Sequence, residues 1–107
     1  CATLKAEMRH GGGRMALSLA RMEACYFVND CFLPPDYILT HIDRLNGKRA
    51  YIIQGRHDVI CPPFSARALA SKWPSAKLTM IDDAGHSAFE PGILSSLLQA
   101  LDDMTKA

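Results

Sequence analysis

The chain has 107 residues, of which 49% are hydrophobic and 21% are charged, so its composition is that of a globular domain and not of a disordered segment. The formal net charge is +1, and Lys and Arg are spread along the sequence, which argues against a nucleic-acid surface and a polybasic membrane anchor. No apolar run approaches the roughly 20 residues of a membrane-spanning helix, and no signal peptide is visible. We therefore expect no nucleic-acid partner and no membrane partner.

The cysteines bear on the cellular location of the protein, and the first residue bears on whether the chain is complete. The chain has four cysteines, Cys1, Cys25, Cys31 and Cys61, at irregular spacing and without a CxxC pair. This favours reduced thiols in a cytoplasmic protein over a disulfide framework. Because the chain begins with Cys1 and not with Met, we expect a fragment, a processed product or an incomplete chain. The oligomeric state is left open by the sequence.

Residues 1–49 are predicted to be helical and irregular. Three consecutive glycines, residues 11–13, predict a break in regular structure. The apolar and alanine residues from 14 to 27 suit a helix. Pro34 and Pro35 interrupt the chain, residues 36–45 are predicted to form a second short helix, and Asn46-Gly47 is typical of a turn.

Residues 50–107 are predicted to alternate strand, helix, strand and helix. Residues 50–54 and 77–81 are short apolar runs, typical of strands that are buried in a parallel sheet. Residues 64–73 predict a helix that Pro74 ends, and an apolar stripe from Ile93 to Met104 predicts the last helix. Two successive strand–helix units imply an α/β fold with a parallel sheet. Two strands cannot bury both faces of such a sheet, so further strands are expected beside them.

Two side chains that suit acid–base chemistry follow the two predicted strands. Asp58 lies in the loop after the first strand, and His86 lies in the loop after the second. Because ligands of open α/β sheets bind at the carboxyl ends of the strands, the two loops are expected to meet there. A carboxylate that orients an imidazole makes the imidazole a general base. The sequence therefore predicts a catalytic pair, in the order acid then base that α/β-hydrolases show.

Asp58 and His86 also have interpretations other than a catalytic pair. A loop histidine is often an exposed or structural residue, and an aspartate after a strand is often a turn former. His57 on the same loop is interpreted as a structural residue or as one that supports the site without contacting the substrate. A zinc site of His57, Asp58, Cys61 and His86 has suitable ligand types but matches no known spacing, so no metal is predicted. No G-x-S-x-G occurs in the chain, so a serine nucleophile is expected upstream of Cys1.

Three segments resemble the C-terminal part of proline iminopeptidases (prolyl aminopeptidases), a branch of the α/β-hydrolases. Residues 53–63 (IQGRHDVICPP) are similar to the acid loop of that family, and residues 84–93 (AGHSAFEPGI) to its histidine loop. Residues 20–29 (ARMEACYFVN) are similar to a stretch of its helical cap. The resemblance spans residues 14–104, although His57 stands where the family has a tyrosine. It implies that residues 1–49 form part of a helical cap with a return linker, and that residues 50–107 form the C-terminal βαβα portion of an α/β-hydrolase core.

The resemblance also implies an activity and a substrate. It implies a serine exopeptidase that releases N-terminal proline from peptides without a metal or cofactor. The upstream serine attacks, His86 moves the proton and Asp58 orients His86. Glu23 is expected to bind the amino group of the terminal proline, and Phe27 and Cys61 to line the proline pocket. Each has a simpler alternative: Glu23 as a solvated residue or an ion-pair partner of Arg21, and Phe27 and Cys61 as packing residues.

Two other functions stay open at this point. Another α/β-hydrolase, such as an esterase or an epoxide hydrolase, would carry the same Asp58 and His86 loops. A catalytically incomplete fragment would act only as a binding module, because loss of the nucleophile removes the covalent route.

Overall fold

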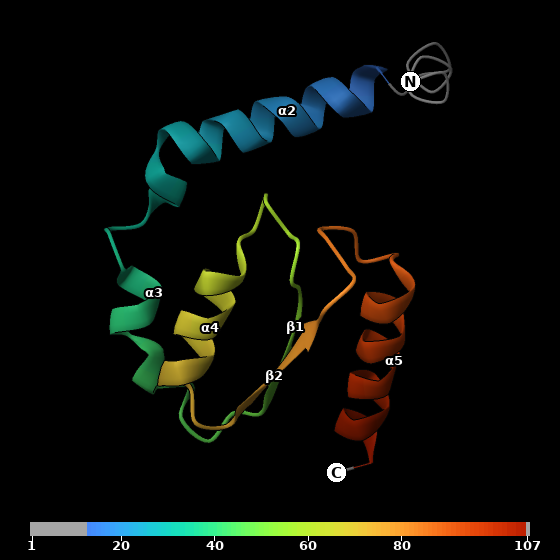
Figure 1. The fold of residues 1–107 in the computed structure, drawn as a ribbon. Coiled ribbons are helices and arrows are strands. Elements are labelled where there is room, and N and C mark those ends of the chain that lie inside the picture. Colours follow the sequence, from blue (N-terminus) through green and yellow to red (C-terminus); the bar gives the residue numbers. More distant parts are fainter. Residues whose placement is uncertain (1–12, 107) are drawn as a thin grey trace. The chain divides into compact units, whose positions relative to one another are not determined.

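The computed structural model describes residues 13–106, and the chain divides into two compact units with the boundary between Tyr37 and Ile38. The predictions for Cys1, Gly11 and Gly12 lie outside the described residues. Figure 1 shows the course of the chain through both units. Within residues 13–106, no helix has both the length and the apolar character that crossing a membrane requires.

The first unit is dominated by one long helix, α2 (Gly13–Val28), as the sequence predicted for residues 14–27. Gly13 is part of this helix, so the prediction that it belongs to a break was wrong. A glycine is tolerated at this place because it stands in the first turn, where the amide has no helical partner to lose. No residue of α2 is buried. The side-chain amide of Asn29 donates a hydrogen bond to the carbonyl of Cys25 (2.8 Å) at the end of the helix.

A left-handed turn follows α2. Asp30, Cys31 and Phe32 form η2 (Asp30–Phe32) with φ angles of 49°, 55° and 57°. Aspartate tolerates this region, whereas cysteine and phenylalanine rarely adopt it. The ring of Phe32 meets the ring of Tyr26 edge to face, with 5.3 Å between centroids. This aromatic contact ties the turn to the last turn of α2.

The short helix predicted for residues 36–45 is divided in the structure. It consists of α3 (Tyr37–Thr40) and a 3-10 turn, η3 (Ile42–Leu45), with His41 between them. Asp36, which was expected to be helical, instead has a φ of 56°. Only Ile42 is buried in this stretch, so a continuous helix would gain little packing energy. The expected turn at Asn46-Gly47 is present, with Gly47 at a φ of 77°.

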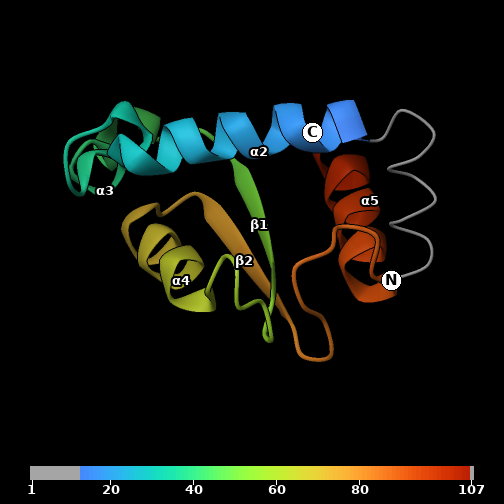
Figure 2. The same ribbon diagram turned by 90° about the horizontal axis from the view of Figure 1, so that it is seen from above.

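The second unit contains a two-stranded parallel sheet with a helix on each side (Figures 1 and 2). β1 (Ala50–Gly55) pairs with β2 (Ala76–Ile81) in register, from Ala50 opposite Ala76 to Gly55 opposite Ile81. The helix α4 (Pro63–Lys72) follows β1, and α5 (Pro91–Thr105) follows β2. Both helices begin with a proline at their first position, where its missing N–H costs no hydrogen bond. The predicted strand–helix–strand–helix order is confirmed.

The buried apolar residues of the described chain are few and mostly small. They are Ile42, Ala66, Ala84, Ile93 and Ala100. Ala66 comes from α4, Ile93 and Ala100 come from α5, and Ala84 comes from the loop that follows β2. The core therefore lies where the two helices meet the sheet and the loop at the end of β2.

Candidate active site

The loops that follow β1 and β2 are joined to each other just beyond the strands. The amide of Arg56 donates to the carbonyl of Ile81 (2.9 Å), and the amide of His57 donates to the carbonyl of Ala84 (2.9 Å). Gly55 makes this approach possible, because a Cβ at this position would lie 2.1 Å from the carbonyl oxygen of Gly85. The carboxyl ends of the two strands thus bring both loops to one place, as the sequence predicted.

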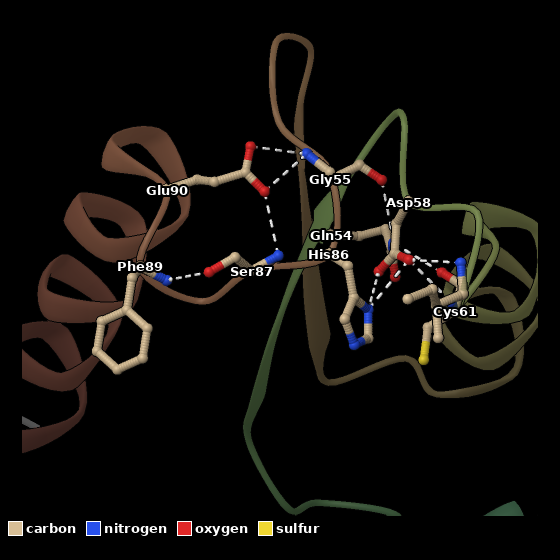
Figure 3. Close-up of polar contacts among 10 residues, drawn as sticks. Gln54, Gly55, Asp58, Cys61, His86, Ser87, Phe89 and Glu90 are labelled. Carbon is tan, nitrogen blue, oxygen red and sulfur yellow. Dashed lines mark hydrogen bonds and ion pairs between the residues drawn. The ribbon is translucent and has the colours of Figure 1, made fainter. Parts of the chain in front are cut away.

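Asp58 and His86, 28 positions apart in sequence, meet at this place. The Nδ1 atom of His86 lies 3.1 Å from Oδ1 and 3.0 Å from Oδ2 of Asp58. Figure 3 shows the imidazole ring directed at the carboxylate. The Asp58 side chain is only 7% exposed, whereas that of His86 is 51% exposed. The carboxylate is therefore held inside the loop while the imidazole is accessible from outside.

The backbone of its own loop fixes the Asp58 carboxylate. The amides of Ile60 and Cys61 donate to Oδ1 at 3.0 and 2.8 Å, so Asp58 also forms the turn that was its structural alternative. Burial raises the pKa of Asp58, but the hydrogen bonds from Cys61, His86 and Ile60 and the charge of His86 outweigh burial and lower the pKa below 3.8. Asp58 is therefore ionised at neutral pH.

An ionised Asp58 decides which nitrogen of His86 carries the proton. A carboxylate without a proton only accepts hydrogen bonds, so the Nδ1 atom that faces it must be the donor. In neutral His86 this leaves Nε2 as the acceptor, on the side of the ring away from Asp58. An imidazole held in this tautomer can take a proton from a hydroxyl group that approaches Nε2.

Two further side chains stabilise the loops and were not singled out from the sequence. The Nε2 amide of Gln54 donates to the carbonyls of Gly55 and Cys61, both at 3.0 Å, and so closes the loop that carries Asp58. Arg56 forms an ion pair with Asp82, whose Oδ1 lies 2.6 Å from Nε. Gln54 lies near the end of β1 and Arg56 directly follows it. Polar residues are common at such places, and the sequence holds no signal for these partners.

Of the five predicted site residues, the structure brings three together. Asp58, Cys61 and His86 lie in the second unit, with one side-chain ligand atom of each within 4.8 Å of the others. His57 is exposed and does not belong to this group, and its interpretation as a structural residue stays a prediction. Glu23 and Phe27 lie on α2 in the first unit, where both are exposed. No ion pair between Glu23 and Arg21 forms among residues 13–106, and the substrate-binding roles of Glu23, Phe27 and Cys61 stay predictions.

The same three side chains offer ligand types that a zinc ion accepts. A tetrahedral zinc site with bonds of about 2.0–2.3 Å needs ligand atoms roughly 3.3–3.8 Å from one another. The cluster is as wide as 4.8 Å, and the Nδ1 proton and both oxygens of Asp58 are already used in hydrogen bonds. The arrangement therefore suits an acid–base pair better than a resident metal.

Comparisons with known proteins show the family to which the chain belongs. The family model described as alpha/beta hydrolase fold matches residues 12–93, which include both loops of the site. The chain belongs to the α/β-hydrolase fold family. In members of this fold the acid and the histidine follow the nucleophile along the chain, in the order in which Asp58 and His86 occur here.

The similar proteins point to one branch of the α/β-hydrolase fold family. The chain is 45% identical over 92 residues to proline iminopeptidase of Arabidopsis thaliana, a match that covers 85% of this chain and 24% of the relative. It is 44% identical to a probable proline iminopeptidase of Leptolyngbya boryana (79% of this chain, 27% of the relative) and 40% identical to proline iminopeptidase of Xanthomonas citri (87% and 30%). The chain thus spans only 24–30% of the length of these curated relatives.

Proposed function

We propose that this chain is part of a serine exopeptidase that releases N-terminal proline from peptides. The observation that carries the proposal is the pair of Asp58 and His86, with 3.0 Å between Oδ2 and Nδ1, at the carboxyl ends of two parallel strands. The similarity to proteins named proline iminopeptidase supports the choice of substrate. The nucleophile of the proposed triad is a serine that precedes this segment in the full-length protein.

The geometry of the pair suits the proposed reaction. The serine hydroxyl attacks the carbonyl of the N-terminal prolyl residue, and Nε2 of His86 accepts the hydroxyl proton. Asp58 stabilises the imidazolium through Nδ1, since its carboxylate stays ionised. His86 then returns the proton to the leaving amine, and water hydrolyses the prolyl ester of the serine by the same steps. Backbone amides outside this segment are proposed to bind the oxyanion.

Glu23 supplies the proposed specificity for a free N-terminus. An aminopeptidase must recognise the charged amino group of its substrate, and a carboxylate is the natural partner of this group. Glu23 is exposed on α2 and has no ion-pair partner among residues 13–106, so its charge is available to a ligand. Phe27 is one helical turn further along the same helix, and we propose that it contacts the proline ring together with Cys61.

Replacement of Glu23 by Gln in the full-length protein tests this substrate. We expect kcat/KM for a prolyl arylamide to fall by roughly 10- to 100-fold, the loss expected for one charge-assisted hydrogen bond of about 1.5–3 kcal/mol. Hydrolysis of a neutral aryl ester should be unchanged, because it has no amino group to bind. Asp43→Asn, which removes an exposed carboxylate from η3, is the matched control.

Three results, the first from Glu23→Gln and the other two from the unsubstituted full-length protein, would contradict the peptidase proposal. Equal losses on the arylamide and the ester would argue for a general hydrolase, such as an esterase. Hydrolysis of an epoxide but not of the arylamide would indicate an epoxide hydrolase. A full-length protein that is not labelled by a fluorophosphonate, a reagent for activated serines, would indicate a binding module.

A cytoplasmic location is also proposed. The thiols of Cys25, Cys31 and Cys61 are free and exposed, a state that a reducing compartment maintains. If the location is right, the full-length protein should be found with its thiols available to maleimide labelling in the cytosolic fraction.

A further inference from the structure

The loop that carries His86 is held by a carboxylate from the same loop, Glu90. The backbone amide of Gly85 donates to both oxygens of Glu90, at 3.0 Å to Oε1 and 2.9 Å to Oε2. The amide of Ser87 donates to Oε1 at 3.1 Å. These amides belong to the residues immediately before and after His86. Figure 3 shows the Glu90 side chain directed at the amide of Ser87.

Glu90 does not use its carboxylate for the helix that it precedes. It stands at the N-cap position of α5, where an acidic side chain ordinarily accepts from amides of the first helical turn. Here no such side-chain hydrogen bond forms, and Pro91 takes the first helical position. The carboxylate instead turns back to the amides on either side of His86. Its contacts therefore serve the histidine loop and not the helix.

The rest of the loop is arranged so that the carboxylate reaches these amides. The amide of Glu90 donates to the carbonyl of Ser87 (3.1 Å), which closes a turn. The amide of Phe89 donates to Oγ of Ser87 (3.2 Å) within the same turn. Gly85 lies directly beside the carboxylate, since a Cβ at this position would be in van der Waals contact with Oε1, at 3.4 Å. The half-buried Glu90 side chain is thus enclosed by the loop whose amides it binds.

We propose that Glu90 is a positioning residue for His86. The proposal rests on the proposed function, in which His86 is the general base. Asp58 fixes the His86 ring through Nδ1. This contact forms only if the backbone of residue 86 holds the ring within reach of the carboxylate. Glu90 fixes this backbone from both sides through charge-assisted hydrogen bonds, which are stronger than neutral ones. Glu90 and Asp58 together define the direction of Nε2.

Glu90→Gln in the full-length protein tests the proposal. In the wild type the Gly85 amide donates to both oxygens of Glu90. Glutamine has the same side-chain shape, but its NH2 group replaces one of these acceptors and places a donor against the Gly85 amide. We expect kcat to fall by roughly 10- to 100-fold, the loss typical of a misplacement of about 1 Å. KM should change less than about twofold, because Glu90 does not touch the substrate. Asp83→Asn, which removes an exposed carboxylate from the same loop, is the matched control and should leave kcat unchanged.

A second measurement separates positioning from general stability and from the choice of substrate. The Nδ1 proton of His86, observed by NMR, should exchange with water faster in Glu90→Gln than in the wild type or in Asp83→Asn. This signal does not depend on the substrate, so it reports on Glu90 even if a prolyl arylamide proves not to be cleaved. A lowered kcat and faster exchange support the proposal, provided that the thermal midpoint stays within a few degrees. An unchanged kcat and an unchanged Nδ1 proton overturn it.

A milder variant keeps the proposal testable if Glu90→Gln does not fold. Glu90→Asp keeps the charge but shortens the side chain by one methylene, so the carboxylate no longer reaches the amides of both Gly85 and Ser87. We expect kcat to decrease severalfold and the exchange of the Nδ1 proton to accelerate. A folded Glu90→Asp protein with wild-type kcat and wild-type exchange would refute the positioning role.

Discussion

The Asp58 carboxylate makes two sets of hydrogen bonds, one to its own loop and one to His86, and Oδ1 takes part in both. Its Oδ1 accepts from the amides of Ile60 and Cys61 and so shapes the loop, while both oxygens face Nδ1 of His86. The structural and the catalytic interpretations of this residue, which the sequence could only present as alternatives, are therefore compatible. A turn that is built on the carboxylate also holds the carboxylate at the place where it orients the imidazole.

The lowered pKa of Asp58 predicts how it contributes to stability at acid pH. The group binds its proton less readily in the folded than in the unfolded protein, so its stabilising contribution is complete well above pH 3.8. As the pH falls below 3.8 and through the lower pKa of the folded state, the unfolded state gains protons first and the contribution is lost. The difference in unfolding free energy between wild type and Asp58→Asn should therefore be constant at neutral pH and shrink below about pH 4.

Denaturant titrations of the full-length protein at a series of pH values measure this difference. Asp83→Asn is the control for the general titration of carboxylates, because Asp83 is exposed. A difference between wild type and Asp58→Asn that grows as the pH falls would mean that the pKa of Asp58 is raised and not lowered.

At the scale of elements, the site depends on how closely the end of β1 approaches the loop after β2. A Cβ on residue 55 would lie 2.1 Å from the carbonyl oxygen of Gly85 and 2.6 Å from that of Ala84. Both contacts are with backbone atoms, so no side chain can move aside. Because residue 85 directly precedes His86, a displacement of residue 85 that relieves the clash also moves His86 relative to Asp58.

We therefore predict that Gly55→Ala lowers both stability and activity. Overpacking of this kind costs about 1–3 kcal/mol, and a shift of about 1 Å between acid and base costs roughly 100-fold in kcat. Gly47→Asn is the control, since a Cβ at residue 47 would have no atom within 4 Å and asparagine tolerates its φ of 77°. Thermal unfolding and prolyl arylamide hydrolysis measure the two effects. Wild-type kcat in Gly55→Ala would show that the loops separate without loss of the pair.

The strands and helices of the second unit were predictable because their apolar residues form clear patterns and prolines stand at their boundaries. Strands expected at residues 50–54 and 77–81 occur as β1 and β2, and α4 and α5 begin at prolines. The meeting of Asp58 and His86 followed from the parallel topology alone. The hydrogen bonds of Glu90 to backbone amides and of Gln54 to backbone carbonyls could not be predicted, because every residue type carries these backbone groups. The division of residues 36–45 into α3 and η3 was also missed, since one buried side chain leaves no periodic pattern.

At the scale of the whole molecule, the described residues leave much apolar surface uncovered. No large side chain among them is fully buried, and large apolar residues on α2, α4 and α5 are exposed. A groove of about 390 Å³ separates α5 from one face of the sheet, where Tyr51, Ile53, Lys77 and Thr79 line it. In the two-stranded sheet, β1 and β2 each pair along one edge only. Such a sheet needs further strands beside it to bury its faces.

We therefore predict that a protein consisting only of these 107 residues does not unfold cooperatively. The few buried side chains are mainly alanine and isoleucine, and their burial provides too little free energy to offset the loss of conformational entropy on folding. The isolated chain should bind the dye ANS, which reports exposed apolar surface, and should show a broad thermal transition. The full-length protein, measured beside it, should melt sharply and bind little dye. A sharp transition of the isolated chain without ANS binding would mean that α4 and α5 cover the sheet without further strands, and that the Asp58–His86 pair can form without the rest of the protein.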